Sequence, residues 1–322
     1  MLNRKSNSGT LCVLVVCAVL QLECNKPTET ERIDPPPVDW TGLSSGVTAT
    51  LYAVTCIDSM TAYACGDQGR IVRTTNGGST WTTLNSGITS KLYGLFFFDA
   101  DTGYVAGEME RILRTTDFGA SWTTVNSSNS GNLYSIEFTG PSTGYACGDG
   151  GKIVMTTDNG STWVEISSGL APVFSSITFS DGLTGFAVGG PGTILKTTDA
   201  GTNWSATASI TDNGLTNVRF IDVNNGFVVG YGGTILKTTN AGSTWFAQSS
   251  GLSTPLRSIF FSDQNTGYAV GDGGKILQTT NGGGNWQAQN SGTSTILLSV
   301  SLVNARTGFA VGGSGTILKK SN

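Results

Sequence analysis

Histidine is absent from the 322 residues of the chain. Its absence excludes Ser-His and Cys-His nucleophilic mechanisms and removes the commonest metal ligand. Charge is also sparse, because charged residues make up 12% of the chain and the formal net charge is −4. This weakly acidic balance argues against nucleic acid as a partner, since phosphate binding requires clustered positive charge. We predict no nucleic-acid partner, no metal and no cofactor.

The chain also lacks an apolar run long enough for a membrane span. The run Leu11–Leu22 has twelve residues, which is too short to cross a bilayer. Two basic residues precede it, and Cys24 and the polar stretch Asn25–Pro37 follow it. This layout resembles a bacterial lipoprotein signal, which implies that Cys24 is lipidated and holds the protein in the cell envelope, at the outer membrane or the periplasmic face. Gln21 and Glu23 depart from that signal, so plain secretion is the alternative.

Tryptophan, by contrast, recurs with a fixed period. Every interval between neighbouring tryptophans is 41 residues. Self-similarity with a period in this range marks stacked units or propeller blades. The seven structural positions of the repeat are Trp40, Trp81, Trp122, Trp163, Trp204, Trp245 and Trp286.

Within one repeat, short segments of strand character alternate with turns. The copy that ends at Trp163 contains the strand-like segments 133–138, 144–148, 152–157 and 162–166, with glycine-bearing turns between them. Four short antiparallel strands in a unit of about forty residues are typical of a propeller blade. The 45 glycines of the chain and the closely spaced turn signals leave little room for a helix.

An octapeptide, Thr-x-Asx-x-Gly-x-Thr/Ser/Asn-Trp, separates the third and fourth strands in six complete copies. Its Asx side chain can accept hydrogen bonds from nearby backbone N–H groups, and its glycine can adopt a positive φ. These residues resemble the Asp-box, or BNR repeat, of sialidases and related propellers. Because six symmetric copies cannot share one active site, we interpret the box as a turn and a core anchor rather than a metal or catalytic site. The Asx positions are Asn76, Asp117, Asp158, Asp199, Asn240 and Asn281.

The two ends of the repeat array are each incomplete. Trp40 has no strands of its own blade before it, whereas Ser301–Lys320 supplies three strands and lacks the fourth. We therefore predict that Val38–Ser44 completes the last blade. The expected fold is all-β: a seven-bladed propeller of four-stranded antiparallel blades over residues 38–322, after a signal peptide at 1–23 and a polar tether at 24–37.

Three cysteines lie in the repeat region. Cys65 and Cys147 occupy the same position of the second strand two blades apart, so they cannot form a disulfide with each other. Cys56 is expected across the first hairpin from Cys65. Both a cross-strand disulfide and two buried free thiols are compatible with the sequence.

The copies differ most clearly at two positions that a blade brings to one face. The second residue of the first strand is Tyr52, Tyr93, Tyr134, Ser175, Thr216, Arg257 or Leu298, and the residue that opens the third strand is Arg70, Arg111, Lys152, Thr193, Thr234, Lys275 or Thr316. Tyrosines and basic residues thus coincide on the first three blades, as at protein and glycan interfaces. The candidate binding face is Tyr52, Tyr93, Tyr134, Arg70, Arg111, Lys152 and Arg257. The alternative is that the tyrosines pack between blades and the basic residues are solvated.

Other departures from the repeat are interpreted as ordinary surface variation. They are Glu137 and Arg219, which share a later position of the first strand, and the turn Glu108-Met109-Glu110 in place of a glycine-rich turn.

The full repeat, Thr-Gly-Tyr/Phe-Ala-x-Gly-x-x-Gly-x-Ile-Leu-x-Thr-Thr-Asx-x-Gly-x-Thr-Trp, resembles the photosystem II assembly and stability factor family over residues 36–322. The resemblance implies a non-enzymatic propeller that holds a membrane subunit during complex assembly through an arginine-rich face. Arginines are few here, so we expect a different partner. The prediction is a monomeric, lipid-anchored or secreted scaffold that binds a protein, with membrane proteins among the candidates. The alternative is a glycan-binding or sialidase-like propeller, although the arginine triad and tyrosine–glutamate pair of sialidases are not found.

Overall fold

A computed structural model describes residues 39–126 and 131–320 of the chain. The chain divides into two units, Met1–Pro36 and Pro37–Asn322, and the described residues belong to the second. The predicted signal peptide, the lipidation site Cys24 and the tether lie outside the described residues. Within the described part, no helix has the length and apolar character needed to cross a membrane.

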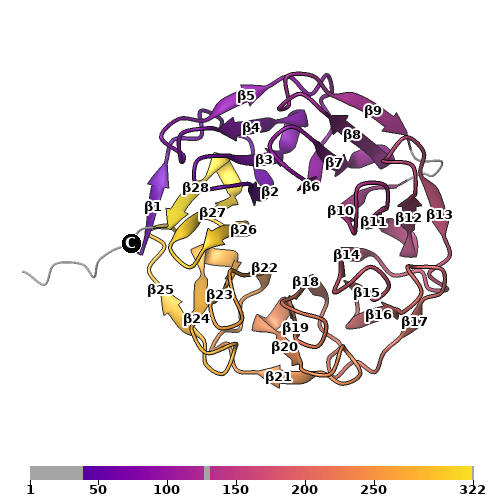
Figure 1. The fold of residues 1–322 in the computed structure, drawn as a ribbon. Helices are drawn as coiled ribbons and strands as arrows, with labels where there is room; N and C mark the ends of the chain where they lie inside the picture. The colour runs from indigo at the N-terminus through magenta and orange to yellow at the C-terminus, as the bar shows by residue number, and fades with distance from the viewer. Residues whose placement is uncertain (1–38, 127–130, 321–322) are drawn as a thin grey trace, which may run out of the picture. The chain divides into compact units, whose positions relative to one another are not determined.

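The second unit is a ring of seven four-stranded sheets, as predicted (Figure 1). In every blade the four strands are antiparallel, and they are arranged side by side from the centre of the ring to its rim. The innermost strands are β2 (Leu51–Cys56), β6 (Leu92–Phe97), β10 (Leu133–Phe138), β14 (Phe174–Phe179), β18 (Leu215–Phe220), β22 (Leu256–Phe261) and β26 (Leu297–Asn304). The second strands are β3 (Ala62–Gly66), β7 (Gly103–Gly107), β11 (Gly144–Gly148), β15 (Gly185–Gly189), β19 (Gly226–Gly230), β23 (Gly267–Gly271) and β27 (Thr307–Gly312).

In each blade the two outer strands together contain fewer residues than the two inner strands. The third strands are β4 (Ile71–Thr74), β8 (Arg111–Thr115), β12 (Ile153–Thr156), β16 (Thr193–Thr197), β20 (Ile235–Thr238), β24 (Ile276–Thr279) and β28 (Ile317–Lys320). The strands on the rim are β5 (Thr82–Leu84), β9 (Thr123–Asn126), β13 (Val164–Ile166), β17 (Ser205–Ala206), β21 (Phe246–Gln248), β25 (Gln287–Gln289) and β1 (Trp40–Leu43). Single 3₁₀ turns join most second and third strands: η1 (Asp67–Gly69), η2 (Glu108–Glu110), η3 (Asp149–Gly151), η4 (Tyr231–Gly233), η5 (Asp272–Gly274) and η6 (Gly313–Gly315).

The N-terminal strand closes the ring, which confirms the prediction for Val38–Ser44. β1 pairs antiparallel with β28, in the register that sets Trp40 opposite Lys320 and Leu43 opposite Ile317. The last blade is therefore built from both ends of the propeller. Closure of this kind satisfies the backbone groups that an open β28 would leave exposed.

The octapeptide forms a turn, as expected. In the third blade, Asp158 Oδ1 accepts the N–H of Thr162, four residues on, at 2.8 Å. The Thr156 hydroxyl oxygen accepts the N–H of Gly160 at 3.0 Å, and Gly160 has a φ of +71°. Trp163 then packs with only 4% of its surface exposed. The box is thus a hydrogen-bonded turn that ends in a buried anchor.

The core lies between blades, where aromatic rings repeat with the same period. At five junctions an aromatic residue of a second strand packs against the phenylalanine that ends the next inner strand, for example Tyr104 on Phe138, with ring centroids 4.3 Å apart. The rings are stacked at the other four junctions, Tyr63–Phe97, Tyr145–Phe179, Phe186–Phe220 and Phe227–Phe261. At the remaining junctions the inner strands carry Cys56 or Leu302 instead. This regular packing explains why the sequence keeps its period so strictly.

The cysteines do not form the hairpin pair that the sequence suggested, and Cys56, Cys65 and Cys147 are all free. In the β2–β3 hairpin Cys56 lies opposite Ala62, whereas Cys65 lies opposite Ala53. That register separates the two cysteines by three residues along the strand, or roughly 10 Å. The expectation that Cys56 faces Cys65 was therefore wrong, and the alternative of free thiols holds.

Candidate functional site: the central cavity

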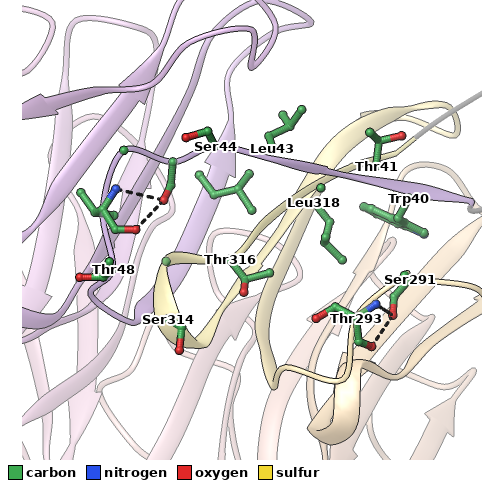
Figure 2. Close-up of a pocket in the computed structure, with 17 residues that line it drawn as sticks. Trp40, Thr41, Leu43, Ser44, Thr48, Ser291, Thr293, Ser314, Thr316 and Leu318 are labelled. Carbon is green, nitrogen blue, oxygen red and sulfur yellow. Dashed lines mark hydrogen bonds between the residues drawn. The ribbon is translucent and has the colours of Figure 1, made fainter.

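A groove at the closure of the ring encloses about 870 Å³. Figure 2 shows its lining: β1 and the loop after it, the turn with Ser291 and Thr293, and the start of β28 with Thr316 before it. In the loop after β1, the Ser45 hydroxyl donates to the Val47 carbonyl at 2.9 Å and accepts the Val47 N–H at 3.2 Å. The Ser291 hydroxyl makes the same two bonds with Thr293.

The same groove recurs at other blades. Grooves of about 580 and 520 Å³ occupy equivalent positions, one beside Ser250 and Thr234 and the other beside Ser86 and Arg70. The hydroxyls of Ser250 and Ser86 each donate to the carbonyl and accept the N–H of the residue two positions on, as Ser45 and Ser291 do. A feature that recurs in this way belongs to the architecture of the ring. These grooves therefore do not mark one blade as a binding site.

The central cavity is different, because the ring has one centre. It encloses about 670 Å³ and is lined by the inner strands of all seven blades. The second residue of every inner strand contributes to the lining: Tyr52, Tyr93, Tyr134, Ser175, Thr216, Arg257 and Leu298. These are the first of the two variable positions that the sequence singled out. A concave site lined by aromatic and polar side chains is the usual setting for ligand or partner binding.

Three tyrosines form a continuous arc in this cavity. The Tyr93 ring lies between those of Tyr52 and Tyr134, with centroids 5.0 and 5.1 Å away. All three side chains are half-buried, so they are neither fully packed between blades nor fully exposed. We call these residues the tyrosine arc. Their mutual contacts hold the rings in place, and their exposed edges face the cavity.

Each hydroxyl of the tyrosine arc bonds to a carboxylate at the start of the following turn. Tyr52 donates to Asp67 at 3.0 Å and Tyr134 donates to Asp149 at 2.8 Å. Tyr93 donates to Glu108 at 3.3 Å. Burial, together with the hydrogen bond to Asp67, raises the pKa of Tyr52 to about 12. The hydroxyls therefore act as neutral donors near neutral pH, and the partners of the arc are acidic rather than basic.

Three of the four basic residues of the candidate face do not line the central cavity. Arg70 lines a groove beside η1 and the loop after β5, and Arg111 begins β8. Lys152 is buried and forms an ion pair with Glu110 of the preceding blade. Of these four basic residues Arg257 lines the cavity, where it donates to Asp272 through two bonds of 2.7 and 2.8 Å and contacts the ring of Tyr231. The structure thus brings together the tyrosines and Arg257 but not the other basic residues.

The opposite end of the cavity contains two residues that sequence reasoning set aside. Glu137 and Arg219 both line the cavity, from β10 and β18. Each is the penultimate residue of its inner strand, three residues beyond the arc position. The available signal was their departure from Thr55, Phe96, Thr178, Phe260 and Ser301 at the same position of other blades. The sequence alone could not show that this position faces one shared cavity.

Metal chemistry finds no support in the part of the chain that the structure describes. No group of three or more cysteine, aspartate or glutamate side chains there is arranged to hold a metal ion. Six of the seven tryptophan indole N–H groups are buried and have no hydrogen-bond partner among the described residues, at Trp40, Trp81, Trp122, Trp204, Trp245 and Trp286. Because this feature recurs around the ring, it belongs to the blade core.

Comparison with solved structures identifies similar propellers. A structure described as YCF48 bound to D1 peptide is 20% identical, covers 89% of this chain and 96% of its own, and has a TM-score of 0.75. YCF48 from Cyanidioschyzon merolae is 19% identical, with coverages of 88% and 98% and a TM-score of 0.74. A GH74 enzyme from Niastella koreensis is 18% identical, with coverages of 87% and 53% and a TM-score of 0.71. At these identities the likeness shows the fold alone.

Sequence comparison identifies the family. No curated protein matches the chain significantly. The profile of the photosynthesis system II assembly factor YCF48 family matches residues 36–164 and 120–210, which together span more than half of the chain. These segments contain the tyrosine arc and the first four Asp-boxes. The chain therefore belongs to the photosystem II assembly factor YCF48 family.

Proposed function

We propose that this protein is a non-catalytic scaffold that binds a segment of a partner protein at the tyrosine-lined mouth of its central cavity and holds that partner during assembly. The observation that carries this proposal is the tyrosine arc, an asymmetric feature in an otherwise repetitive ring. Family membership supports the assembly role. A related YCF48 structure contains a D1 peptide, which supports a peptide segment as the bound element.

We infer that the partner differs from that of an arginine-rich propeller face. The hydroxyls of Tyr52, Tyr93 and Tyr134 are all held by carboxylates, and Arg257 is neutralised by Asp272. The arc therefore offers aromatic edges and shared acidic acceptors. Such a surface suits a partner segment with apolar and hydrogen-bond-donating side chains, because aromatic anchors carry much of the energy of protein interfaces.

Affinity purification from detergent-solubilised membranes of the native host tests this function. The wild-type protein is compared with Tyr93→Ser, because serine occupies the same position in the fourth blade at Ser175. We expect the wild type to retain one stoichiometric partner and the variant to lose most of it, while the melting temperatures of the two stay close. Retention of the same partner by a folded Tyr93→Ser variant would remove the arc from the interface.

Anchoring through Cys24 completes the proposal. A lipoprotein with a diacyl or triacyl anchor would stay with the membrane, since one acyl chain gives only marginal binding. We expect the wild type to incorporate labelled fatty acid and Cys24→Ala to lose the label. Equal labelling of both forms contradicts the anchor and leaves plain secretion.

A glycan-acting propeller is the second candidate, favoured by the fold shared with GH74 enzymes. Most glycoside hydrolases require two carboxyl groups flanking the bond that breaks. Among the described residues that line the central cavity, Glu137 is the single acidic side chain. We expect no release of sugars from xyloglucan or from a fluorogenic sialoside. Turnover of either substrate that disappears in Glu137→Gln would favour the enzyme instead.

A further inference from the structure

We propose that the end of the central cavity opposite the tyrosine arc binds a small zwitterion, a free α-amino acid with an apolar side chain. Its carboxylate would bind Arg219 and its ammonium group Glu137. This inference goes beyond the scaffold function, and the cavity position it uses lies three residues further along the inner strands than the arc. The proposal rests on the hydrogen bonding of both side chains and on the rings beside them.

Arg219 presents a guanidinium group without an acidic partner. The side chain is half-buried, lines the cavity and lies over the ring of Phe260, with 5.2 Å between its central carbon and the ring centroid. None of the described residues accepts a hydrogen bond from it or forms an ion pair with it. Arg257, in the same cavity, is held by both oxygens of Asp272. Arg219 is therefore able to take a carboxylate in the paired geometry that guanidinium groups favour.

Glu137 presents one carboxylate oxygen that the fold does not require. Its Oε1 accepts the Thr178 hydroxyl at 3.2 Å and the Phe179 N–H at 3.4 Å, and so joins β10 to β14. At the equivalent junction the short hydroxyl of Ser301 accepts the N–H of Cys56 at 3.1 Å. Serine is thus sufficient for the structural bond. The carboxylate adds a negative charge and a second oxygen, Oε2, which has no partner among the described residues.

The two charges face one cavity without touching. They occupy the same position of β10 and β18, two blades apart, and no ion pair within 4.0 Å joins them. Burial raises the pKa of Glu137. The positive charge of Arg219 opposes that rise through an electrostatic interaction with the carboxylate. A ligand with an ammonium group at one end and a carboxylate at the other would compensate both charges. An isolated anion or cation would compensate one.

Apolar surface beside the two charged groups is the reason for proposing an amino acid with an apolar side chain. Phe96 and Phe260 hold the same strand position in two other blades and both line the cavity. Their rings offer contact area to an aliphatic or aromatic side chain. The probes are therefore L-phenylalanine and L-leucine.

Isothermal titration calorimetry with these amino acids tests the proposal. Each is titrated into the full propeller, beside 3-phenylpropionate, which lacks the ammonium group, and phenethylamine, which lacks the carboxylate. We expect at least one amino acid to bind and both analogues to bind tenfold or more weakly, because each loses a charged hydrogen bond. Binding of neither amino acid at millimolar concentration, or binding of 3-phenylpropionate with the affinity of L-phenylalanine, overturns the proposal.

Two variants taken from sibling blades locate the binding site. Glu137→Ser copies Ser301 and keeps an acceptor for the Phe179 N–H, and Arg219→Thr copies Thr55. Arg306→Thr is the matched control, because Arg306 is exposed and does not line the cavity. We expect the first two to weaken amino-acid binding tenfold or more and the control to bind as the wild type does. Unchanged binding in folded Glu137→Ser or Arg219→Thr places the ligand elsewhere and refutes the assignment.

Discussion

At the scale of single residues, the second blade has a glutamate where its siblings have a glycine of positive φ. Glu110 has a φ of +56°, a region that disfavours most side chains. Six other blades have glycine at this position: Gly69, Gly151, Gly192, Gly233, Gly274 and Gly315. A Cβ at Gly151 would lie 1.8 Å from the carbonyl oxygen of Leu170, so glycine is needed there. Glu110 is instead buried against Lys152 of the next blade.

A double-mutant cycle measures the interaction between Glu110 and Lys152. Lys152→Thr, which copies Thr193, leaves the buried Glu110 without its ion pair and should lower the free energy of unfolding by about 3–5 kcal/mol. Adding Glu110→Gly removes the buried carboxylate and restores the sibling turn, so most of that loss should be recovered. Chemical denaturation of both single variants and the double variant provides the free energies. Additive losses in the double variant would show that the two residues are independent.

Residue-scale detail is also where sequence reasoning stopped short. The 41-residue alignment placed Tyr52, Tyr93 and Tyr134 together correctly, because one strand position repeats in every blade. It did not reveal that their hydroxyls bond to the carboxylates of Asp67, Glu108 and Asp149, because side-chain direction cannot be read from the repeat. The alignment likewise misplaced Cys56 relative to Cys65, because hairpin register cannot be read from repeat spacing alone.

At the scale of elements, β1 is the strand on which the closed ring depends. Trp40 is fully buried and packs edge-on against Tyr268, with ring centroids 5.6 Å apart. This junction lacks the inner-strand phenylalanine of its siblings, because Leu302 takes its place. At the next junction Cys56 replaces phenylalanine, and Trp81 lies 5.2 Å from Phe309. The indole groups are thus closer to the second-strand ring than at Phe186–Trp245, where the distance is 6.3 Å.

Deletion of the closing strand should be far more costly than deletion of the residues before it. Removing residues 25–46 takes away β1 and leaves the outer edge of β28 unpaired, so we expect aggregation or a large fall in melting temperature. Removing residues 25–34 leaves β1 in place and should change the melting temperature little. Thermal melts and size-exclusion chromatography compare the two deletions. A monomeric longer deletion with an unchanged melting temperature is incompatible with closure by β1.

The closing strand also shows what sequence reasoning did predict at this scale. The tryptophan period predicted the number of blades and their four strands each. It also predicted which strand completes the last blade. These predictions followed because each blade buries its core against its neighbours, which forces the same spacing on every copy. Strand ends were less accurate: β13 begins at Val164, whereas the expected strand began at residue 162.

At the scale of the whole molecule, turn carboxylates determine the response to acid. The N–H of Thr162 and the side-chain bonds beside it lower the pKa of Asp158 to about 2. Hydrogen bonds from Ser121 lower the pKa of Asp117, and those from Asn203 lower the pKa of Asp199. The backbone N–H groups of Met60 and Thr61 do the same for Asp58. Glu137 acts in the opposite direction, because burial raises its pKa.

Stability should therefore fall in acid. A carboxylate with a lowered pKa in the folded state contributes stability above its unfolded pKa, near 3.9, and loses it as the pH falls toward the folded value. We expect a melting temperature that is nearly constant from pH 7 to 5 and decreases between about pH 4 and 2. The chain has no histidine, so no histidine titration near pH 6.5 should intervene. Differential scanning calorimetry across this range measures the profile, and a constant melting temperature down to pH 2 would contradict it.

The central claim is that repeated positions build the ring while the asymmetric cavity mouth binds a partner. Site-specific photo-crosslinking in intact cells tests it most directly, with a benzophenone amino acid in place of Tyr231 at the mouth or of Phe246 on the rim. Both residues are exposed aromatics of the fifth blade, at 47% and 58%. We predict one discrete covalent adduct from position 231 that Tyr93→Ser diminishes, and none from position 246. The same adducts from both positions, or an adduct from 246 alone, would contradict the account.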